Sequence, residues 1–436
     1  MDARDDPILQ PGFAFSQDLY SYESVGDNKS NLDDQLFAIS VPANSTLLGS
    51  FQLMLNTAIG SGTLLVPYCY TLGVGCALII STIFALIAYT ALYFMIKSSF
   101  FCQKYDYRGL FSHTFGEKRL WIVNVMIFLV QFGACMIYAH WNGRLMNKVV
   151  GSNHPVFGSN AFWCFLISTL LVFPLTIFRQ IAKLEKFEIL STISIIVMVI
   201  HAIYWFGRGI VEDGFDPDHK LVGFSISDVM INALSVNSMA FNCHINLFPT
   251  LEHLSNCTLR RAFTLAGMTV GVSYLLYNMF GLFTYLYLFD NLGEGSALEF
   301  YPMKHWFTTI TILCVIVSLV LSSPLVIWAA RNSINHLIWG NNATNMRWIM
   351  IGGTIVLLTS LLASTSDNVC LFFDIFGGLF TPIIIFLMPS LFYLKNVPNL
   401  KWYNKMLAIV IASFTVIAAC ACTYHVIDEI IKNFKK

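Results

Sequence analysis

The chain of 436 residues is 56% hydrophobic and only 11% charged, with a mean hydropathy of +0.66. Soluble proteins carry about a quarter charged residues, so this composition excludes an ordinary soluble domain and indicates an integral membrane protein. The formal net charge is zero, which provides no general attraction toward nucleic acid, and we expect no nucleic-acid partner.

The N-terminal segment differs from the rest of the chain. Residues 1–46 carry eight Asp or Glu side chains against Arg4 and Lys29, and contain no apolar run. This composition predicts a disordered tail rather than a cleaved signal peptide. Residues 47–426 are predicted to form one transmembrane domain, and 427–436 a short C-terminal tail.

Windows of about 20 apolar residues, the length that crosses a bilayer as a helix, can be placed eleven times after the tail. The expected spans are 47–70, 72–97, 120–146, 159–178, 187–208, 227–249, 262–289, 306–330, 347–364, 369–393 and 404–426. We therefore expect an all-α integral membrane protein. Of its Lys and Arg residues, 17 fall on the side of the tail and 8 on the other. This bias places the N-terminus in the cytosol and the C-terminus on the opposite side.

The first span contains a segment that weakens a helix, NTAIGSGTLLVPY at 56–68, with Gly60-Ser61-Gly62 at its centre. Unpaired backbone groups cost several kcal/mol in hydrocarbon, so irregular backbone is found only where protein or a water-filled cavity supplies partners. Close packing of small residues against a neighbouring helix is the structural alternative.

A second irregular segment lies in the sixth span, VNSMAFNCHINLFP at 236–249. Polar residues inside a membrane usually indicate a site or a pathway, although His244 is equally compatible with a structural role. The first and sixth spans lie about 180 residues apart, and each begins a set of five. This pattern predicts a 5+5 inverted repeat whose first helices are broken at a binding site, with the eleventh helix outside the repeat.

These segments resemble the amino acid/auxin permease family, and within it the sodium-coupled neutral amino acid transporters and the fungal vacuolar amino acid transporters. The resemblance covers about residues 44–425 and rests on 56–68 and on Phe241, Cys243, His244 and Pro249. Weaker matches are Gln131, Gly133 and Tyr138, SPLVIWAARNSI at 323–334, FGG at 376–378 and FLMPSLFYLK at 386–395. It implies a fold of the bacterial leucine-transporter type.

The resemblance also implies where a substrate would bind. Freed N–H groups at Gly60, Ser61 and Gly62 would hold the carboxylate of an amino acid, because a helix start carries partial positive charge. Freed carbonyls from Ser238 to Asn242 would hold the ammonium group. Thr57 and Phe241 complete the predicted substrate-binding set.

A cation site is implied beside the substrate. By analogy with sodium symporters of this fold, its ligands would be the carbonyls of Asn56, Ile59 and Leu319 and the hydroxyls of Ser322 and Ser323. The last three lie at i, i+3 and i+4, on one helical face. Five oxygens without a fixed charge suit Na⁺ better than a divalent cation. Serines also commonly bond back to their own helix, which is the structural alternative.

Proton coupling is the competing mode, and its candidates are the intramembrane titratable residues His201, Asp374 and His244. Either way, the expected function is secondary active transport of amino acids by alternating access, without a cofactor. Neutral amino acids are favoured as substrates because no charged side chain is expected among the substrate-binding residues. A membrane sensor that binds its ligand without sustained transport is the alternative.

Other functions find little support in the sequence. No catalytic motif indicates an enzyme, and no repeated filter or ring of like charge indicates a channel. The plasma membrane and a vacuolar or lysosomal membrane are both compatible with these features. A monomer is compatible too, and the sequence leaves the oligomeric state open.

Overall fold

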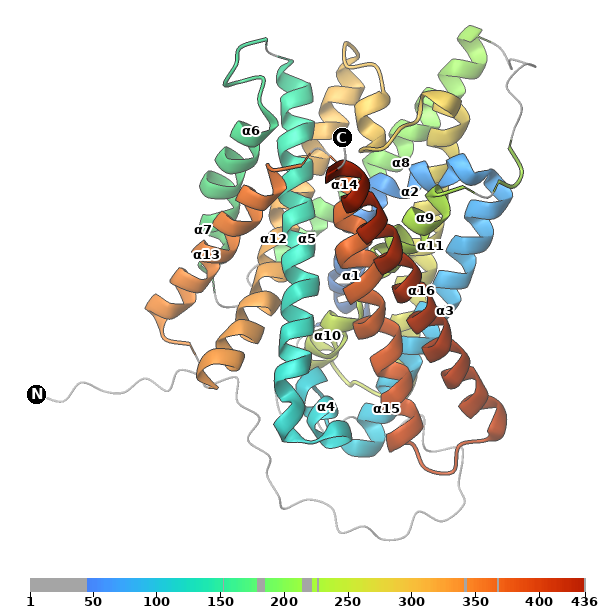
Figure 1. Cartoon of the computed structure of the whole chain (residues 1–436), viewed down its shortest axis with the longest axis vertical. Coiled ribbons are helices and arrows are strands. Elements are labelled where there is room, and N and C mark those ends of the chain that lie inside the picture. Colours follow the sequence, from blue (N-terminus) through green and yellow to red (C-terminus); the bar gives the residue numbers. More distant parts are fainter. Residues whose placement is uncertain are drawn as a thin grey trace, which may run out of the picture.

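The computed structural model describes residues 45–434, apart from 152, 179–184, 214–221, 226, 341–342 and 367. Figure 1 shows its helices side by side in an upright bundle, which confirms the expected all-helical class. We call the end of the bundle where the first helix begins the N-terminal face, and the opposite end the far face. The predicted tail over 1–46 lies almost wholly outside the described residues.

Within the described residues, eight helices are long and apolar enough to cross a membrane. They are α3 (Val74–Cys102), α5 (Leu120–Val150), α8 (Glu185–Asp213), α11 (Leu259–Leu288), α12 (Trp306–Trp339), α13 (Asn345–Ala363), a continuous helix formed by α14 (Val369–Phe372), η9 (Phe373–Phe380), η10 (Ile383–Leu387) and α15 (Met388–Asn396), and α16 (Trp402–Phe434). Such helices pair their backbone groups internally, as a hydrocarbon environment requires. Because α16 extends to Phe434, residues 427–434 of the expected tail are helical.

The other three expected spans are built from shorter helices. The first contains α1 (Leu47–Ala58), η1 (Ser61–Leu65), α2 (Val66–Cys69) and η2 (Tyr70–Leu72). The fourth contains α6 (Asn160–Ile167), η4 (Ser168–Val172) and α7 (Phe173–Thr176), and the sixth contains α9 (Val229–Ala240), η6 (His244–Asn246) and α10 (Leu247–His253). The total of eleven spans therefore stays a prediction.

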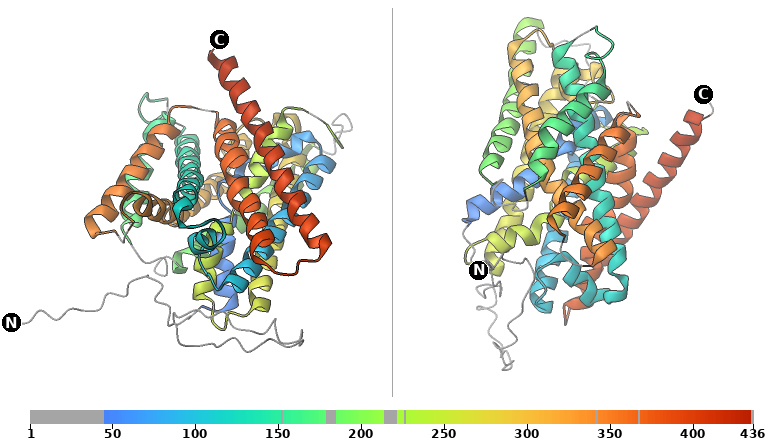
Figure 2. Two further views of the ribbon diagram at one scale, coloured as in Figure 1. Left: turned by 60° about the horizontal axis from the view of Figure 1, so that its bottom comes forward. Right: turned by 90° about the vertical axis from the view of Figure 1, so that its left-hand side faces the viewer.

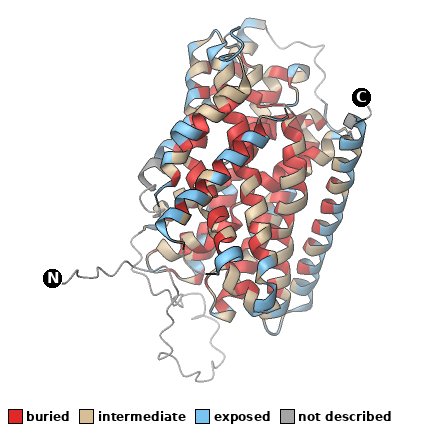
Figure 3. Cartoon of the chain, turned by 60° about the vertical axis from the view of Figure 1, so that its left-hand side comes forward, coloured by how far each residue is buried: buried red, intermediate tan, exposed pale blue. Residues whose placement is uncertain are grey.

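The long helices differ in how far they are enclosed. α12 packs against both α5 and α8, and it is the most enclosed of the candidate spans. α16 is the least enclosed and runs along the outside of the bundle (Figure 2). Figure 3 shows buried residues gathered inside and exposed residues facing outward. Large apolar side chains such as Leu86 and Leu275 are among the exposed ones, as expected for a surface in contact with lipid.

Short helices connect the spans at both faces. α4 (Tyr107–Phe115) and η3 (Glu117–Arg119) join α3 to α5, while η7 (Phe289–Asn291) and η8 (Ala297–Phe300) join α11 to α12. At the far face, α3 begins after Gly73, whose φ of +101° is unfavourable for other residues. A Cβ atom there would also lie 2.7 Å from the carbonyl carbon of Gly223. This turn therefore depends on glycine.

Candidate functional site

Two points where a helix ends inside the bundle form the centre of the candidate site. The first is the α1–η1 junction, Ile59 and Gly60, between the end of α1 and the start of η1. The second is the α9–η6 junction, Phe241 to Cys243. Ile59 has a ψ of 74° and Gly60 a ψ of −142°, so neither continues the helix.

Tyr277 of α11 connects the two junctions. Its hydroxyl lies 2.6 Å from the carbonyl oxygen of Ala58 and 2.7 Å from that of Ala240, the last residues of α1 and α9. Its single proton is shared between these two acceptors, which lie at the helix ends. The Ala58 carbonyl also accepts a hydrogen bond of 2.9 Å from the N–H of Gly60. The ring also packs edge-on against Phe241, at 5.3 Å between centroids. One buried side chain thereby fixes both helix ends.

The backbones of the two segments approach each other closely at Gly62. A Cβ atom on Gly62 would lie 2.7 Å from the Cα atom of Ala240. Contacts between Cβ and backbone atoms at that distance are forbidden, so only glycine allows η1 to lie against the end of α9. The Gly60-Ser61-Gly62 segment therefore has a packing role, which was the structural alternative considered from its sequence.

A cavity opens beside both junctions. It is lined from α1, α5, α9, η6, α12 and the two junctions by Asn56, Thr57, Gly60, Gln131, Ala134, Tyr138, Met239, Asn242, Asn246, Ser322, Leu325 and Val326. The centre of a water-sized sphere can occupy about 20 Å³ of it, which is room for about one water. An amino acid would therefore fit only after the lining helices move apart.

Some of the predicted substrate residues line this cavity and others do not. Gly60, Thr57 and Asn242 line it. Ser238 lies away from it, with its hydroxyl donating to the carbonyl of Leu234 at 2.9 Å, and Phe241 is buried against Tyr277. The Ser238 to Asn242 segment can therefore offer a ligand its backbone groups and the side chain of Asn242, but not those of Ser238 and Phe241.

The α5 helix supplies cavity residues that the sequence indicated only as weak family matches. Gln131 and Tyr138 both line the cavity. A Cβ atom on Gly60 would collide with the hydroxyl of Tyr138, so this phenol lies directly over the α1–η1 junction. Tyr277 carried no signal in the sequence, because an isolated polar residue within a helix forms no recognisable pattern. Asn246 lies within the irregular segment 236–249 but was not singled out there.

The predicted cation ligands lie where α1 meets α8 and α12. Ser323 donates to the carbonyl of Leu319 at 2.6 Å, the back-bonding that was the structural alternative. The hydroxyl of Ser322 lies 3.4 Å from that of Ser191 on α8, which also bonds to Ser318. Ser191 therefore belongs to this hydroxyl cluster, and the sequence did not single it out.

Asn56, whose carbonyl is a predicted cation ligand, also has a side chain that contacts α8. Its Oδ1 accepts a hydrogen bond of 2.9 Å from Thr192 of α8. Because Asn56 and Ser322 line the same cavity, a cation held here would lie next to the substrate. The carbonyl of Ile59 belongs to the α1–η1 junction itself.

The three proton-coupling candidates lie in different places and do not form one site. His201 bonds to Thr308 at 3.2 Å and stacks edge-on against Tyr301, toward the far face. It lies ten residues along α8 from Ser191, or about 15 Å at 1.5 Å per residue. His244 donates from Nε2 to the carbonyl of Ala88 at 3.1 Å, which joins the start of η6 to α3.

Asp374, the third candidate, is fully buried at the start of η9. Its Oδ2 accepts a hydrogen bond of 2.8 Å from Asn232 of α9 and lies 3.5 Å from Nδ1 of His425 on α16. It is therefore hydrogen-bonded within protein rather than hydrated, and it lies away from the cavity residues.

Contacts close the site toward the far face. Nη2 and Nε of Arg144 on α5 donate to Oε2 of Glu299 at 2.8 and 3.2 Å, which holds η8 over the bundle. The hydroxyl of Tyr68 donates to Oε1 of Glu294 at 3.4 Å, and η8 contacts η1. The segment between α11 and α12 therefore covers η1 from that side.

A second closure lies at the N-terminal face. The N–H of Ser45 donates to the carbonyl of His253 at 2.9 Å, and the N–H of Ser255 donates to the carbonyl of Ser45 at 3.0 Å. These bonds tie the start of α1 to the end of α10. Movement of α1 at this face therefore requires movement of α10.

Residues 43–428 match the sequence model of a family described as "Transmembrane amino acid transporter protein". The chain belongs to this family. Its relatives include proteins named "Putative sodium-coupled neutral amino acid transporter 11". The Bos taurus protein is 25% identical over 78% of this chain and 74% of its own length, and the Danio rerio protein 26% over 83% and 81%. The expected family is confirmed, and its members are transporters rather than enzymes.

Solved structures agree with this fold. MhsT in complex with L-phenylalanine superposes with a TM-score of 0.63 at 15% identity, over 88% of this chain and 99% of that one. MHP1, a nucleobase-cation-symport-1 family transporter with bromovinylhydantoin bound, gives a TM-score of 0.58 at 11% identity, over 93% and 96%. At these identities the likeness concerns the fold alone.

Proposed function

We propose that this protein is a secondary active transporter that moves neutral amino acids across a membrane by alternating access. The observation that carries the proposal is the cavity between the α1–η1 junction, the α9–η6 junction, α5 and α12. Within the described residues its lining contains no Asp, Glu, Lys or Arg, which favours a substrate without a charged side chain. The relatives are also named as transporters of neutral amino acids.

The proposed architecture has eleven spans, of which the first and sixth are interrupted at the two junctions. Both of these spans consist of short helices joined by irregular backbone, and in the expected order of spans each begins a set of five. Such an inverted repeat allows one bundle to rock against the other around a fixed site. The N-terminus would lie in the cytosol, and the membrane would be the plasma membrane or that of a vacuole or lysosome.

The substrate would bind mainly through backbone groups. The N–H groups at the start of η1, at Ser61 and Gly62, would hold the carboxylate. The N–H of Gly60, the third predicted donor, already donates to the carbonyl of Ala58 at 2.9 Å. Carbonyl groups at the α9–η6 junction would hold the ammonium group, and Thr57 and Asn242 would contact the substrate from the cavity wall. Gly60 lies between them, where the lack of a side chain makes room for the hydroxyl of Tyr138 over the junction.

Na⁺ is the proposed coupling ion. The hydroxyl of Ser322 and the side chain of Asn56 line the cavity, and Ser191 extends the cluster from α8. An ion bound here would neutralise the substrate carboxylate next to it, so that the binding of each would favour the other. Ordering α1 against α8 and α12 would then close the site.

Reconstituted protein tests the function directly. Uptake of a panel of labelled amino acids into proteoliposomes would be measured with a Na⁺ gradient and with choline in its place, at two pH values. Saturable uptake of neutral amino acids that depends on Na⁺ is the expected result. Ligand binding without flux would instead indicate a sensor, and uptake driven by a pH gradient but indifferent to Na⁺ would refute the ion assignment.

The hydroxyls on α12 provide a test of the ion site. The double variant Ser322→Ala, Ser323→Ala should raise the Na⁺ concentration for half-maximal uptake about tenfold, equivalent to about 1.4 kcal/mol of ion binding. Thr311→Ala is the matched control, because its hydroxyl bonds to the carbonyl of Phe307 on the same helix, away from the cavity. An unchanged Na⁺ dependence in the double variant would exclude these hydroxyls as ligands.

A further inference from the structure

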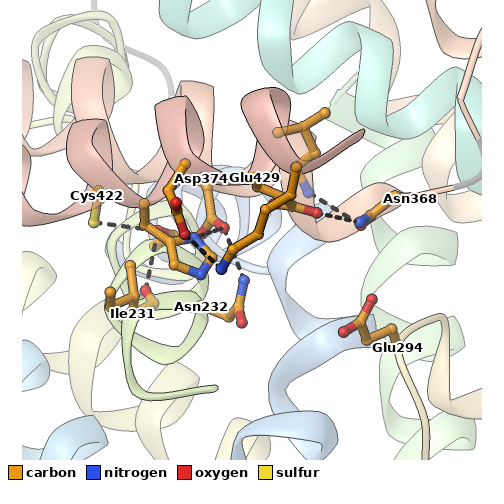
Figure 4. A network of polar contacts seen from close by, with 12 residues as sticks. Ile231, Asn232, Glu294, Asn368, Asp374, Cys422 and Glu429 are labelled. Carbon is orange, nitrogen blue, oxygen red and sulfur yellow. Dashed lines mark hydrogen bonds and ion pairs between the residues drawn. The ribbon is translucent and has the colours of Figure 1, made fainter. Parts of the chain in front are cut away.

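A second polar cluster lies between α16, η9 and α9, near the far face and outside the substrate cavity. It contains Asp374, His425 and Glu429, whose possible ligand atoms all lie within 4.8 Å of one another. Figure 4 shows Asn232 directed at Asp374, and Asn368 next to Glu429. His425 and Glu429 lie four residues apart on α16, so they share one face of that helix.

Local structure brings these three elements close together. η9 is a π-helix, a form that is rare and often found at functional sites. Within it, a Cβ atom on Gly378 would lie 2.6 Å from the hydroxyl oxygen of Ser235 on α9 and 2.8 Å from Cβ of Cys422 on α16. The glycine therefore allows α9 and α16 to approach η9 one turn beyond Asp374.

Asparagine side chains donate hydrogen bonds to the carboxylates of Asp374 and Glu429, but one carboxylate oxygen of Asp374 is left without a donor among the described residues. Nδ2 of Asn232 donates to Oδ2 of Asp374 at 2.8 Å, and Nδ2 of Asn368 donates to Oε1 of Glu429 at 2.7 Å. Oδ1 of Asp374 is buried without a hydrogen-bond partner among the described residues, and Nδ1 of His425 is buried with only the 3.5 Å contact to Oδ2 of Asp374 among those residues. Asp374 is 0% exposed. A fully buried, unpartnered carboxylate oxygen in a polar cluster points to a ligand.

We propose that Asp374, His425 and Glu429 bind a divalent transition-metal ion, with Zn²⁺ as the best fit, which fastens α16 to the core of the bundle. A nitrogen ligand argues against Na⁺, Mg²⁺ and Ca²⁺, which prefer oxygen, whereas His and carboxylate ligands suit Zn²⁺. Zn²⁺ holds such ligand atoms at about 2.0 to 2.2 Å, so small side-chain rotations would close the site. Asn232 and Asn368 would orient the two carboxylates.

The position of His425 gives the ion a route. Its side chain is 19% exposed, so an ion can reach the cluster along the edge of α16. The site would join α16, the least enclosed of the candidate spans, to α9 and η9. This metal site does not depend on the proposed transport function, and the two are tested by separate measurements.

Metal binding is tested with the purified full chain in detergent, stripped with EDTA and titrated with zinc chloride. One Zn²⁺ per chain and a rise in melting temperature with Zn²⁺ are expected. His425→Ala and Glu429→Gln should each weaken binding more than about 100-fold, and Asn232→Ala about 10- to 100-fold, as for other residues that orient metal ligands. His154→Ala, at an exposed histidine between α5 and α6, is the control and should bind as the original protein does.

Two outcomes would overturn the proposal. One is that the protein does not bind Zn²⁺, although circular dichroism and size-exclusion chromatography show that it is folded. The other is Zn²⁺ binding that persists in His425→Ala, as it would if ions bound to the protein's cysteines. Co²⁺ in place of Zn²⁺ separates these cases, because the proposed ligands give a visible spectrum without a thiolate charge-transfer band.

Discussion

Replacing Tyr277 by phenylalanine is expected to reduce amino acid uptake by about tenfold or more while leaving a folded protein. The hydroxyl is shared between the carbonyls of Ala58 and Ala240. Its loss takes this donor from the Ala240 carbonyl and leaves the Ala58 carbonyl with the N–H of Gly60 at 2.9 Å. An unsatisfied buried group costs about 1–3 kcal/mol, and about 1.4 kcal/mol corresponds to a factor of ten. This cost destabilises the arrangement seen in the structure, in which Tyr277 holds the two junctions together.

Uptake into proteoliposomes and the melting temperature measure this effect together. Tyr274→Phe is the matched control, because it removes a hydroxyl from the same helix that lies 2.9 Å from the hydroxyl of Thr82 near the surface, away from both junctions. We expect uptake near that of the original protein in the control, and a fall in both uptake and melting temperature in Tyr277→Phe. Equal uptake by the two variants would show that the shared hydrogen bond contributes nothing to transport.

The sequence predicted the class of fold because its signal is strong and local. Long apolar runs with few charges specify membrane helices, and helices such as α3, α5 and α13 begin within two residues of the expected positions. Glycine and proline in 56–68 also indicated where α1 would be interrupted. These features depend on composition and short-range pattern, which a single chain displays directly.

Contacts between segments far apart in the chain could not be predicted from the sequence. Tyr277 is one of 18 tyrosines, and its partners lie 219 and 37 residues away, so no sequence pattern could single it out. Ser191 was missed for a similar reason, since it is one hydroxyl among many on α8. Their importance arises only from how the helices pack.

The cluster around Asp374 combines one residue that the sequence indicates with two that it does not. An aspartate inside an apolar span is visible in the sequence, and it was a coupling candidate for that reason. Its neighbours His425 and Glu429 come from the last helix, at the end of an expected span and in an expected tail. The packing of α16 on η9 determines that these residues meet, and the sequence contains no short-range signal for that packing.

Replacing Gly62 by alanine is expected to abolish uptake, the largest effect among these variants. The added Cβ atom would lie 2.7 Å from Cα and 2.9 Å from the backbone nitrogen of Ala240. Backbone atoms cannot rotate away as the end of a side chain can, so η1 must separate from α9. Overpacking of this kind costs about 1–3 kcal/mol or more, and here it separates the two segments that border the cavity.

Gly271→Ala separates this steric effect from the general effect of removing a glycine. A Cβ atom on Gly271 of α11 meets no other atom within 4 Å, and alanine favours a helix by about 1 kcal/mol over glycine. The control should therefore keep its uptake and gain slightly in melting temperature, whereas Gly62→Ala loses uptake. If Gly62→Ala transported as well as the control, η1 and α9 would not need their close contact, and the site would have to be held by α5 and α12 instead.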